Sequence, residues 1–191
     1  PEAELDLGLE WRHLRWPLDQ AAQVQSANGA LSVLGTLAAY QTRVEAQLAV
    51  PGQTDGYLKA QGNGSPVGLR LQSLDMATLG GTVKATGELS WDDGINAAAS
   101  WAMEQINPEA LAPSWPGAVN ATGAITISQP GAQAPLAVRL RDVQLGGTLR
   151  EASLSGDVDL SYRAPALSIE QAQLVLGDNR VELSGGIDAD E

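Results

Sequence analysis

A nine-residue phrase recurs six times along the chain and constrains its fold more than any other feature. Each copy has an apolar or small residue at its third, fifth and ninth positions and a glycine at its seventh. Because alternate residues of a β-strand share a face, these four positions lie on one side of a strand. Such a phrase, returning after 25 to 36 residues, is typical of a repetitive β-sheet rather than of a globular enzyme. The copies occupy residues 29–37, 56–64, 81–89, 117–125, 150–158 and 179–187.

The recurring glycine falls on the apolar side of each predicted strand. In the third copy, Val83, Ala85, Gly87 and Leu89 share one face, and polar residues such as Lys84 alternate with them. A glycine at this position lets the sheet bend sharply or leaves open space beside its neighbours.

The segments between the copies also alternate with period two, beginning with Leu5, Leu7, Leu9 and Trp11. The alanine-rich run 95–103 is predicted as a strand because Gly94 and Trp101 flank or interrupt it. A shift of parity between Leu71 and Leu74 predicts a β-bulge, and the polar stretch 19–28 is predicted to be a loop.

One short helical turn is expected near residues 108–112. Asn107 supplies an N-cap, Pro108 occupies the first helical position and Glu109 follows as an early acid. Pro113 and the Trp115-Pro116-Gly117 segment stop it.

These elements predict an all-β protein, an elongated antiparallel meander of about twelve strands joined by consecutive hairpins. A meander of this kind can form a sandwich, a closed barrel or an open sheet folded lengthwise into a trough. No linker or charge run divides the chain, so residues 1–191 are expected to form a single β-repeat segment. Because the pattern is already under way at both ends, we expect a fragment of a longer protein.

Composition excludes several classes of function. The formal net charge of −12 disfavours nucleic-acid binding and docking on anionic membranes, since both need clustered Lys and Arg. The absence of cysteine excludes disulfides, thiol nucleophiles and cysteine-ligated zinc. The scarcity of aromatic residues, five Trp and three Tyr with no Phe, favours an apolar lumen that is not packed solid.

Isolated chemical groups have ordinary structural interpretations. His13 is the only histidine and lacks a readable carboxylate partner, so it is expected at the surface. Asp92 and Asp93 precede a glycine and predict a turn. The pairs Asp157/Asp159 and Asp188/Asp190 share a face but lack a calcium-loop pattern, so solvated faces are expected. We therefore predict no catalytic residue, no metal, no cofactor and no enzyme.

Several phrases resemble the TamB family, within the wider AsmA-like group. They are LEWRHLRWPL (9–18), GALSVLGTL with Tyr40, LGGTVKATGELSW (79–91) and, most specifically, QINPEALAPSWPG (105–117). The resemblance covers most of the chain, and we expect a segment from the middle or later part of a TamB protein. It implies a periplasmic β-structure, anchored to the inner membrane in the full-length protein, whose sheet folds into a U-shaped trough, a β-taco, with an apolar groove. It further implies a TamA-like outer-membrane barrel protein as partner.

The combined expectation is a segment of a hydrophobic periplasmic conduit that moves phospholipids between the inner and outer membranes and is linked to outer-membrane protein assembly. The alternative is a chaperone or assembly scaffold for outer-membrane β-barrel or autotransporter proteins, using the groove or a sheet edge. A structural or adhesive β-protein with a solid core is a third alternative. In the conduit, phospholipid acyl chains contact a lining predicted to comprise Val83, Leu89, Val119, Ile125, Ile127, Val138, Leu140, Leu154, Val158, Leu160, Leu174, Leu176, Val181 and Leu183.

Overall fold

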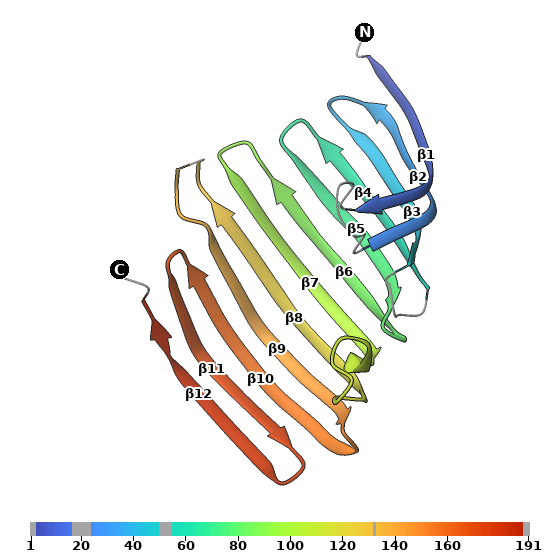
Figure 1. Cartoon of the computed structure of the whole chain (residues 1–191). Coiled ribbons are helices and arrows are strands. Elements are labelled where there is room, and N and C mark those ends of the chain that lie inside the picture. The colour runs from blue at the N-terminus through green and yellow to red at the C-terminus, as the bar shows by residue number, and fades with distance from the viewer. Residues whose placement is uncertain (1–2, 17–23, 50–54, 132, 189–191) are drawn as a thin grey trace.

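A computed structural model describes residues 3–16, 24–49, 55–131 and 133–188. Within these residues, twelve strands form one antiparallel sheet in which every strand pairs with the next strand along the chain (Figure 1). This confirms the all-β meander of about twelve strands. The strands are β1 (Glu4–Trp16), β2 (Val24–Thr36), β3 (Tyr40–Ala49), β4 (Gly56–Ser65), β5 (Gly68–Thr78), β6 (Gly81–Ser90), β7 (Ile95–Ile106), β8 (Gly117–Gln129), β9 (Ala137–Leu149), β10 (Ala152–Arg163), β11 (Ala166–Leu176) and β12 (Asn179–Ile187).

The six copies of the repeated phrase lie on the six even-numbered strands, β2 to β12. Since neighbouring strands are antiparallel, all six copies run in the same direction along the sheet. The structural repeat is therefore a hairpin, one even strand followed by one odd strand. The 3.6-residue period of a helix is absent from the alanine-rich run, which forms β7 as predicted.

The predicted helical turn is a 3₁₀ turn, η1 (Pro108–Ala110), at one end of the sheet between β7 and β8 (Figure 1). The side-chain oxygen of Asn107 accepts hydrogen bonds from the backbone N–H groups of Glu109 at 3.1 Å and Gly117 at 3.2 Å. The backbone N–H of Asn107 donates to the carbonyl of Leu79 at 2.9 Å, in the turn between β5 and β6. Asn107 therefore connects η1 both to the start of β8 and to the neighbouring hairpin.

The same element contacts the hairpin on its other side. Arg150, in the turn between β9 and β10, donates its backbone N–H to the carbonyl of Pro116 at 2.8 Å. Its guanidinium lies 5.4 Å from the centre of the Trp115 ring, within range of a cation–π interaction. The segment that resembles a known family most specifically thus ties three successive hairpins together at one end of the sheet.

Bulges interrupt the regular pairing. The predicted irregularity between Leu71 and Leu74 is confirmed in the pairing of β5 with β6. Further irregularities that the sequence did not predict lie in β7 before Ile106 and in β11 after Ile169. Bulges bend the strand that carries them and increase the local twist. β1 and β2 bend visibly away from the run of the other strands (Figure 1).

One local prediction needs correction. The stretch 19–28 was expected to be a loop, but Val24–Asn28 belongs to β2, because β1 supplies a hydrogen-bonding partner that polarity alone does not reveal. Residues 19–23 lie outside the described part of the chain.

The sheet is a single open layer. Apart from η1 beside β8, substantial contacts join only strands that are neighbours in the sheet. Among the described residues β1 and β12 remain the two unpaired edges, so the sheet is neither a sandwich nor a closed barrel. Its folding into a U-shaped trough stays a prediction.

Candidate functional site

The strand register places apolar side chains of all twelve strands on the same side of the sheet, which we call the apolar face. One row across the centre illustrates this: Leu89 of β6 lies opposite Ala97, which lies opposite Ile127, which lies opposite Val138. A slip of one residue anywhere along this row would move the following side chains to the other face. Bulges do not break the pattern, because Leu140 and Val143 of β9 both face apolar residues of β10 across one.

All fourteen residues that were predicted to line a lipid groove lie on the apolar face of strands β6 and β8 to β12. Whether they contact lipid stays a prediction. The prediction left out β7 and also β1 to β5, although the same alternation was readable in those first five strands. The register adds large apolar residues from these strands to the same face, among them Leu7, Leu9, Leu31, Val33, Val44, Leu58, Leu69, Leu71, Leu74 and Met76.

No second layer covers the apolar face within the described residues. Among the residues that the structure describes, four apolar residues are buried, and all four are small or medium-sized: Ala46, Ala121, Val143 and Ala172. At the two ends of the sheet, Leu7 and Leu183 are 59% and 52% exposed. The third alternative, a β-protein with a solid core, is therefore wrong for this part of the chain.

Total surface area shows how open the sheet is. The chain exposes 12611 Å². A compact monomer of its 19.9 kDa mass would expose about 8,700 Å² by the usual scaling with size. The excess of roughly 4,000 Å² comes from both faces of the single-layered sheet, and the uncovered apolar face is part of it. Large exposed apolar patches are typical of interaction sites.

Aromatic rings cover several glycines on this face. Trp11 lies over Gly29, Tyr40 over Gly64 and Trp101 over Gly123, each ring on the strand adjacent to its glycine. A Cβ atom at Gly123 would lie 2.8 Å from the Trp101 ring and 3.0 Å from Val143. Each of these three glycines makes room for a ring from the next strand. Only Gly123 among them is the seventh residue of a copy, and it does not leave the open space that one interpretation of the sequence expected. Gly185, the seventh residue of the last copy, does have nothing within 4 Å of a Cβ position.

The Trp11 ring also lies beside the irregularity of β1 at His13. Its Nε1–H donates to the Ser26 hydroxyl at 2.9 Å, and that hydroxyl donates to the Asn28 carbonyl at 3.0 Å. Ser26 is the buried polar residue of the described chain, and both of its hydrogen bonds are made locally. The buried Ser26 hydroxyl therefore has both a hydrogen-bond donor and an acceptor.

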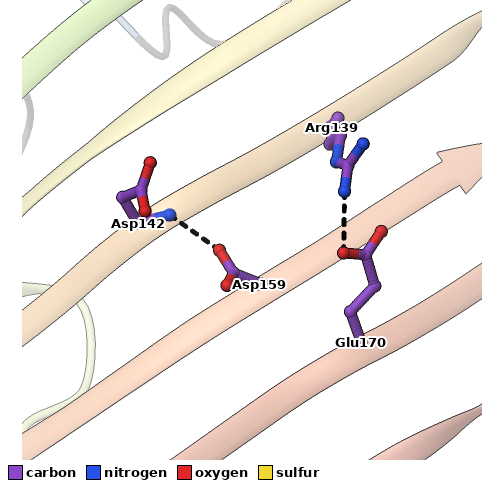
Figure 2. Close-up of polar contacts among 4 residues, drawn as sticks. All are labelled: Arg139, Asp142, Asp159 and Glu170. Atoms are coloured by element: carbon purple, nitrogen blue, oxygen red, sulfur yellow. Dashed lines mark hydrogen bonds and ion pairs between the residues drawn. The ribbon is translucent and has the colours of Figure 1, made fainter.

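The opposite face, here called the polar face, carries the charged residues of the regular strand segments. Figure 2 shows two of its interactions on β9 to β11. The Arg139 guanidinium lies 2.8 Å from a carboxylate oxygen of Glu170, spanning β10 between them. The Asp159 carboxylate accepts a hydrogen bond at 2.7 Å from the backbone N–H of Asp142.

At two bulges, a side-chain oxygen on the polar face accepts a hydrogen bond from the backbone N–H of the bulge residue. Asp142 and Gln105 both have left-handed backbones, with φ of 52° and 57°. The Gln105 N–H donates to the Asn120 side chain at 2.8 Å, as the Asp142 N–H does to Asp159. A side chain on the adjacent even strand thus replaces the ladder hydrogen bond that each bulge loses.

The groups considered as chemical candidates do not converge. His13 is exposed at an irregularity of β1 with φ of 55°, and Asp92 and Asp93 lie in the bend before Gly94. Asp157 accepts from the Gln171 amide at 3.0 Å on the polar face. Asp188 follows β12, and Asp190 lies outside the described residues. In the part of the chain that the structure describes, no three His, Cys, Asp or Glu residues are grouped to hold a metal ion.

These features define a class: β-repeat proteins that present one uncovered apolar face of a single-layered sheet. The sequence model of the TamB N-terminal domain matches residues 1–191. The chain therefore belongs to the TamB family. The match to the N-terminal domain corrects the expectation of a segment from the middle or later part of such a protein. Neither a curated protein nor a solved structure matches the chain significantly.

Family membership implies a role in the translocation and assembly module, whose TamB component is a transport and assembly protein rather than an enzyme. Proteins of the family are typically periplasmic with an anchor in the inner membrane. Among the described residues, no helix has the length and apolar character needed to cross a bilayer.

Proposed function

We propose that the apolar face is a stretch of a periplasmic conduit along which phospholipids move between the inner and outer membranes, in support of outer-membrane protein assembly. The observation that carries the proposal is the continuity of this face across all twelve strands, with the charged residues of the regular segments on the other side. At the usual strand spacing, twelve strands give a face about 50 Å long. Acyl chains suit it, since each buried methylene contributes about 0.8 kcal/mol.

The proposal places the fourteen predicted lining residues against acyl chains and the polar face against water. It includes folding of the sheet into a U-shaped trough. The bend of β1 and β2 supports this part of the proposal, since it shows that strands of this chain can curve (Figure 1). The proposal also treats residues 1–191 as one segment of a longer periplasmic protein, anchored in the inner membrane and working with a TamA-like outer-membrane barrel protein.

A pair of neighbouring substitutions on β8 tests the proposal. Ile125 lies on the apolar face opposite Leu140, and Thr126 lies on the polar face opposite Arg139. Ile125→Arg places a charge among the acyl chains and is expected to reduce co-purified phospholipid, measured by mass spectrometry, at least tenfold. Thr126→Glu places a charge of equal size one residue away on the polar face, opposite Arg139, and is expected to leave the bound lipid unchanged.

Circular dichroism of both variants shows whether the sheet persists. Equal lipid content in Ile125→Arg and the unsubstituted chain would contradict the proposal. The second candidate function, a chaperone for unfolded outer-membrane strands, is favoured by the same uncovered apolar face, which can cover the apolar side of an unfolded strand. Photo-cross-links from the apolar face to nascent barrel proteins, with none to lipid, would support that alternative.

A further inference from the structure

The hairpin turns at one end of the strands carry a row of exposed apolar side chains, which we call the apolar rim. Because all even strands run in the same direction, the turns that follow β2, β4, β6, β8 and β10 lie along the same side of the sheet (Figure 1). Each of these five hairpins has, in or next to its turn, a large apolar residue that is between 36% and 64% exposed. The residues of the apolar rim are Leu37, Val67, Trp91, Ile95, Leu136 and Tyr162.

The turns at the opposite end of the strands have no such row. Among the described residues, the turns at 79–80, 150–151 and 177–178 have no large apolar side chain that is exposed. Leu111 and Trp115, in the loop that contains η1, are the exceptions at this end. Turns are ordinarily built from Gly, Pro, Asn, Asp and Ser, and single exposed apolar residues need no explanation. One such residue in each of five successive hairpins is a pattern that these rules do not account for.

Hydrogen bonds between hairpins fix the position of the apolar rim. The Trp91 indole Nε1–H donates to the Pro66 carbonyl at 2.7 Å, and the Trp91 backbone N–H donates to the Val67 carbonyl at 3.0 Å. The Ala164 N–H donates to the Leu136 carbonyl at 3.2 Å. The turns after β4 and β6 are therefore joined, as are the turns after β8 and β10. Since the indole has a single donor, the exposed part of the Trp91 ring offers a partner apolar surface only.

The spacing of the apolar rim fits an α-helix that lies across the hairpins. Equivalent turns are two strands apart, which is about 9.6 Å at the usual strand spacing. Seven residues of an α-helix rise about 10.5 Å and make two turns, so apolar side chains one heptad apart meet successive hairpins. A β-strand crossing the hairpins would present the same face about every 6.7 Å and would not match them.

A polyproline helix, with a period of about 9.3 Å, has a similar spacing but fits the apolar rim less well. Its backbone makes no internal hydrogen bonds, so its polar groups need partners wherever they are covered. The Trp91 Nε1–H already donates to Pro66 and is not available to such a segment. An α-helix satisfies its own backbone groups and needs only apolar contacts from the apolar rim.

Charged residues beside the apolar rim define the partner further. Asp92 and Asp93 are exposed in the middle hairpin of the five, between two residues of the apolar rim. Arg163 is exposed two hairpins further along. None of the three forms an ion pair with another described residue. Since two hairpins correspond to two heptads, a complementary helix has Lys or Arg beside its apolar stripe at one point and Asp or Glu about 14 residues away.

We infer that the apolar rim docks an amphipathic α-helix of a partner protein, which lies across the hairpins with one apolar residue per heptad on the rim. Its basic residues lie at Asp92 and Asp93, and an acidic residue lies at Arg163. The site is formed by turns inside the chain. The inference does not depend on the proposed lipid function of the apolar face.

Two designed helical peptides of about 30 residues test the spacing. In the probe, five Leu residues recur every seven residues, Lys flanks the third Leu and Glu flanks the fifth, and all other positions are Ala, Gln or further polar residues. In the control, the same five Leu residues recur every six residues, so they no longer share one face of the helix. Fluorescence anisotropy of the labelled peptides, titrated with the chain, is expected to show at least tenfold weaker binding of the control.

Substitutions in the protein test the position of the site. Val67→Ser combined with Leu136→Ser removes apolar contacts from two hairpins and is expected to weaken binding of the probe at least tenfold. Leu111→Ser is the matched control, because Leu111 is 69% exposed at the opposite end of the strands, and it should leave the affinity unchanged. Circular dichroism checks that the sheet persists in each variant.

Charge exchange provides an independent readout. Asp92→Lys combined with Asp93→Lys should weaken binding of the probe at least tenfold, and a peptide with Glu in place of the Lys should bind this variant as tightly as the probe binds the unsubstituted chain. An affinity that does not respond to this exchange would contradict the inferred placement of the helix.

Four other results would overturn the inference. They are no binding of the probe, equal affinities of probe and control, an unchanged affinity in the Val67→Ser/Leu136→Ser variant, and tighter binding of a proline-rich peptide with one Leu in every three residues. Binding of the chain to phosphatidylcholine vesicles that is lost in the same double variant would assign the apolar rim to a lipid surface instead of a helix, and would overturn it as well.

Discussion

The two faces of the sheet share one backbone, but different interactions stabilise them. On the apolar face, rings lie over glycines of adjacent strands, as Trp101 does over Gly123. On the polar face, glycines such as Gly8 and Gly146 have nothing within 4 Å of a Cβ position, and hydrogen bonds fix the bulges instead. The comparison shows that water and local hydrogen bonds satisfy the polar face. The apolar face, in contrast, resembles one side of a hydrophobic core, and the described residues do not provide the layer that would cover it.

The largest expected effect is loss of a ring from the apolar face. Trp101→Ala removes the ring over Gly123 and is expected to lower the free energy of unfolding by about 2–3 kcal/mol, below the range for fully buried Trp because this ring is half-buried. Urea denaturation followed by circular dichroism measures the change. The matched variant Ser100→Ala, on the polar face of the same strand, should change it by less than about 0.5 kcal/mol. Equal effects would mean that the two faces do not differ as described.

The next largest difference is expected between glycine-to-alanine substitutions on the two faces. A Cβ at Gly64 would overlap the Tyr40 ring, so Gly64→Ala should cost about 1–3 kcal/mol of unfolding free energy. Gly146→Ala meets no atom within 4 Å and should be neutral or slightly stabilising. Combining Gly64→Ala with Tyr40→Ala should remove the extra cost, as a double-mutant cycle in urea would show. A neutral Gly64→Ala would indicate that the ring is not held over the glycine.

The smallest effect is expected from the polar face. Asp159→Ala leaves the Asp142 N–H without its acceptor, but water can replace the carboxylate at this exposed site, so the expected loss is about 1 kcal/mol. Asp159→Asn keeps a side-chain oxygen and should recover most of it. Thermal unfolding of the two variants provides the measurement. An Asn variant as unstable as the Ala variant would show that charge, and not the hydrogen bond to the bulge, matters at this position.

The sequence allowed the candidate site to be predicted only in part. Alternation identified one side of each strand, and the parity shift near Leu71 revealed one bulge. The bulges at Gln105 and Asp142 were missed because the residues that satisfy them, Asn120 and Asp159, lie on other strands. The rings over glycines were missed for the same reason, since a repeated glycine does not reveal which side chain lies opposite it.

The amino-acid sequence by itself determined the strands, their order and the separation of apolar from polar side chains, because period-two alternation and hairpin turns are local properties. Tertiary structure decided the register between strands and the bulges that bend them. It also showed that, within the described residues, no second layer covers the apolar side chains. These features depend on pairs of residues far apart in the chain. An alternating strand has the same pattern whether its apolar side faces another sheet or remains uncovered, so only the assembled sheet shows which of these occurs.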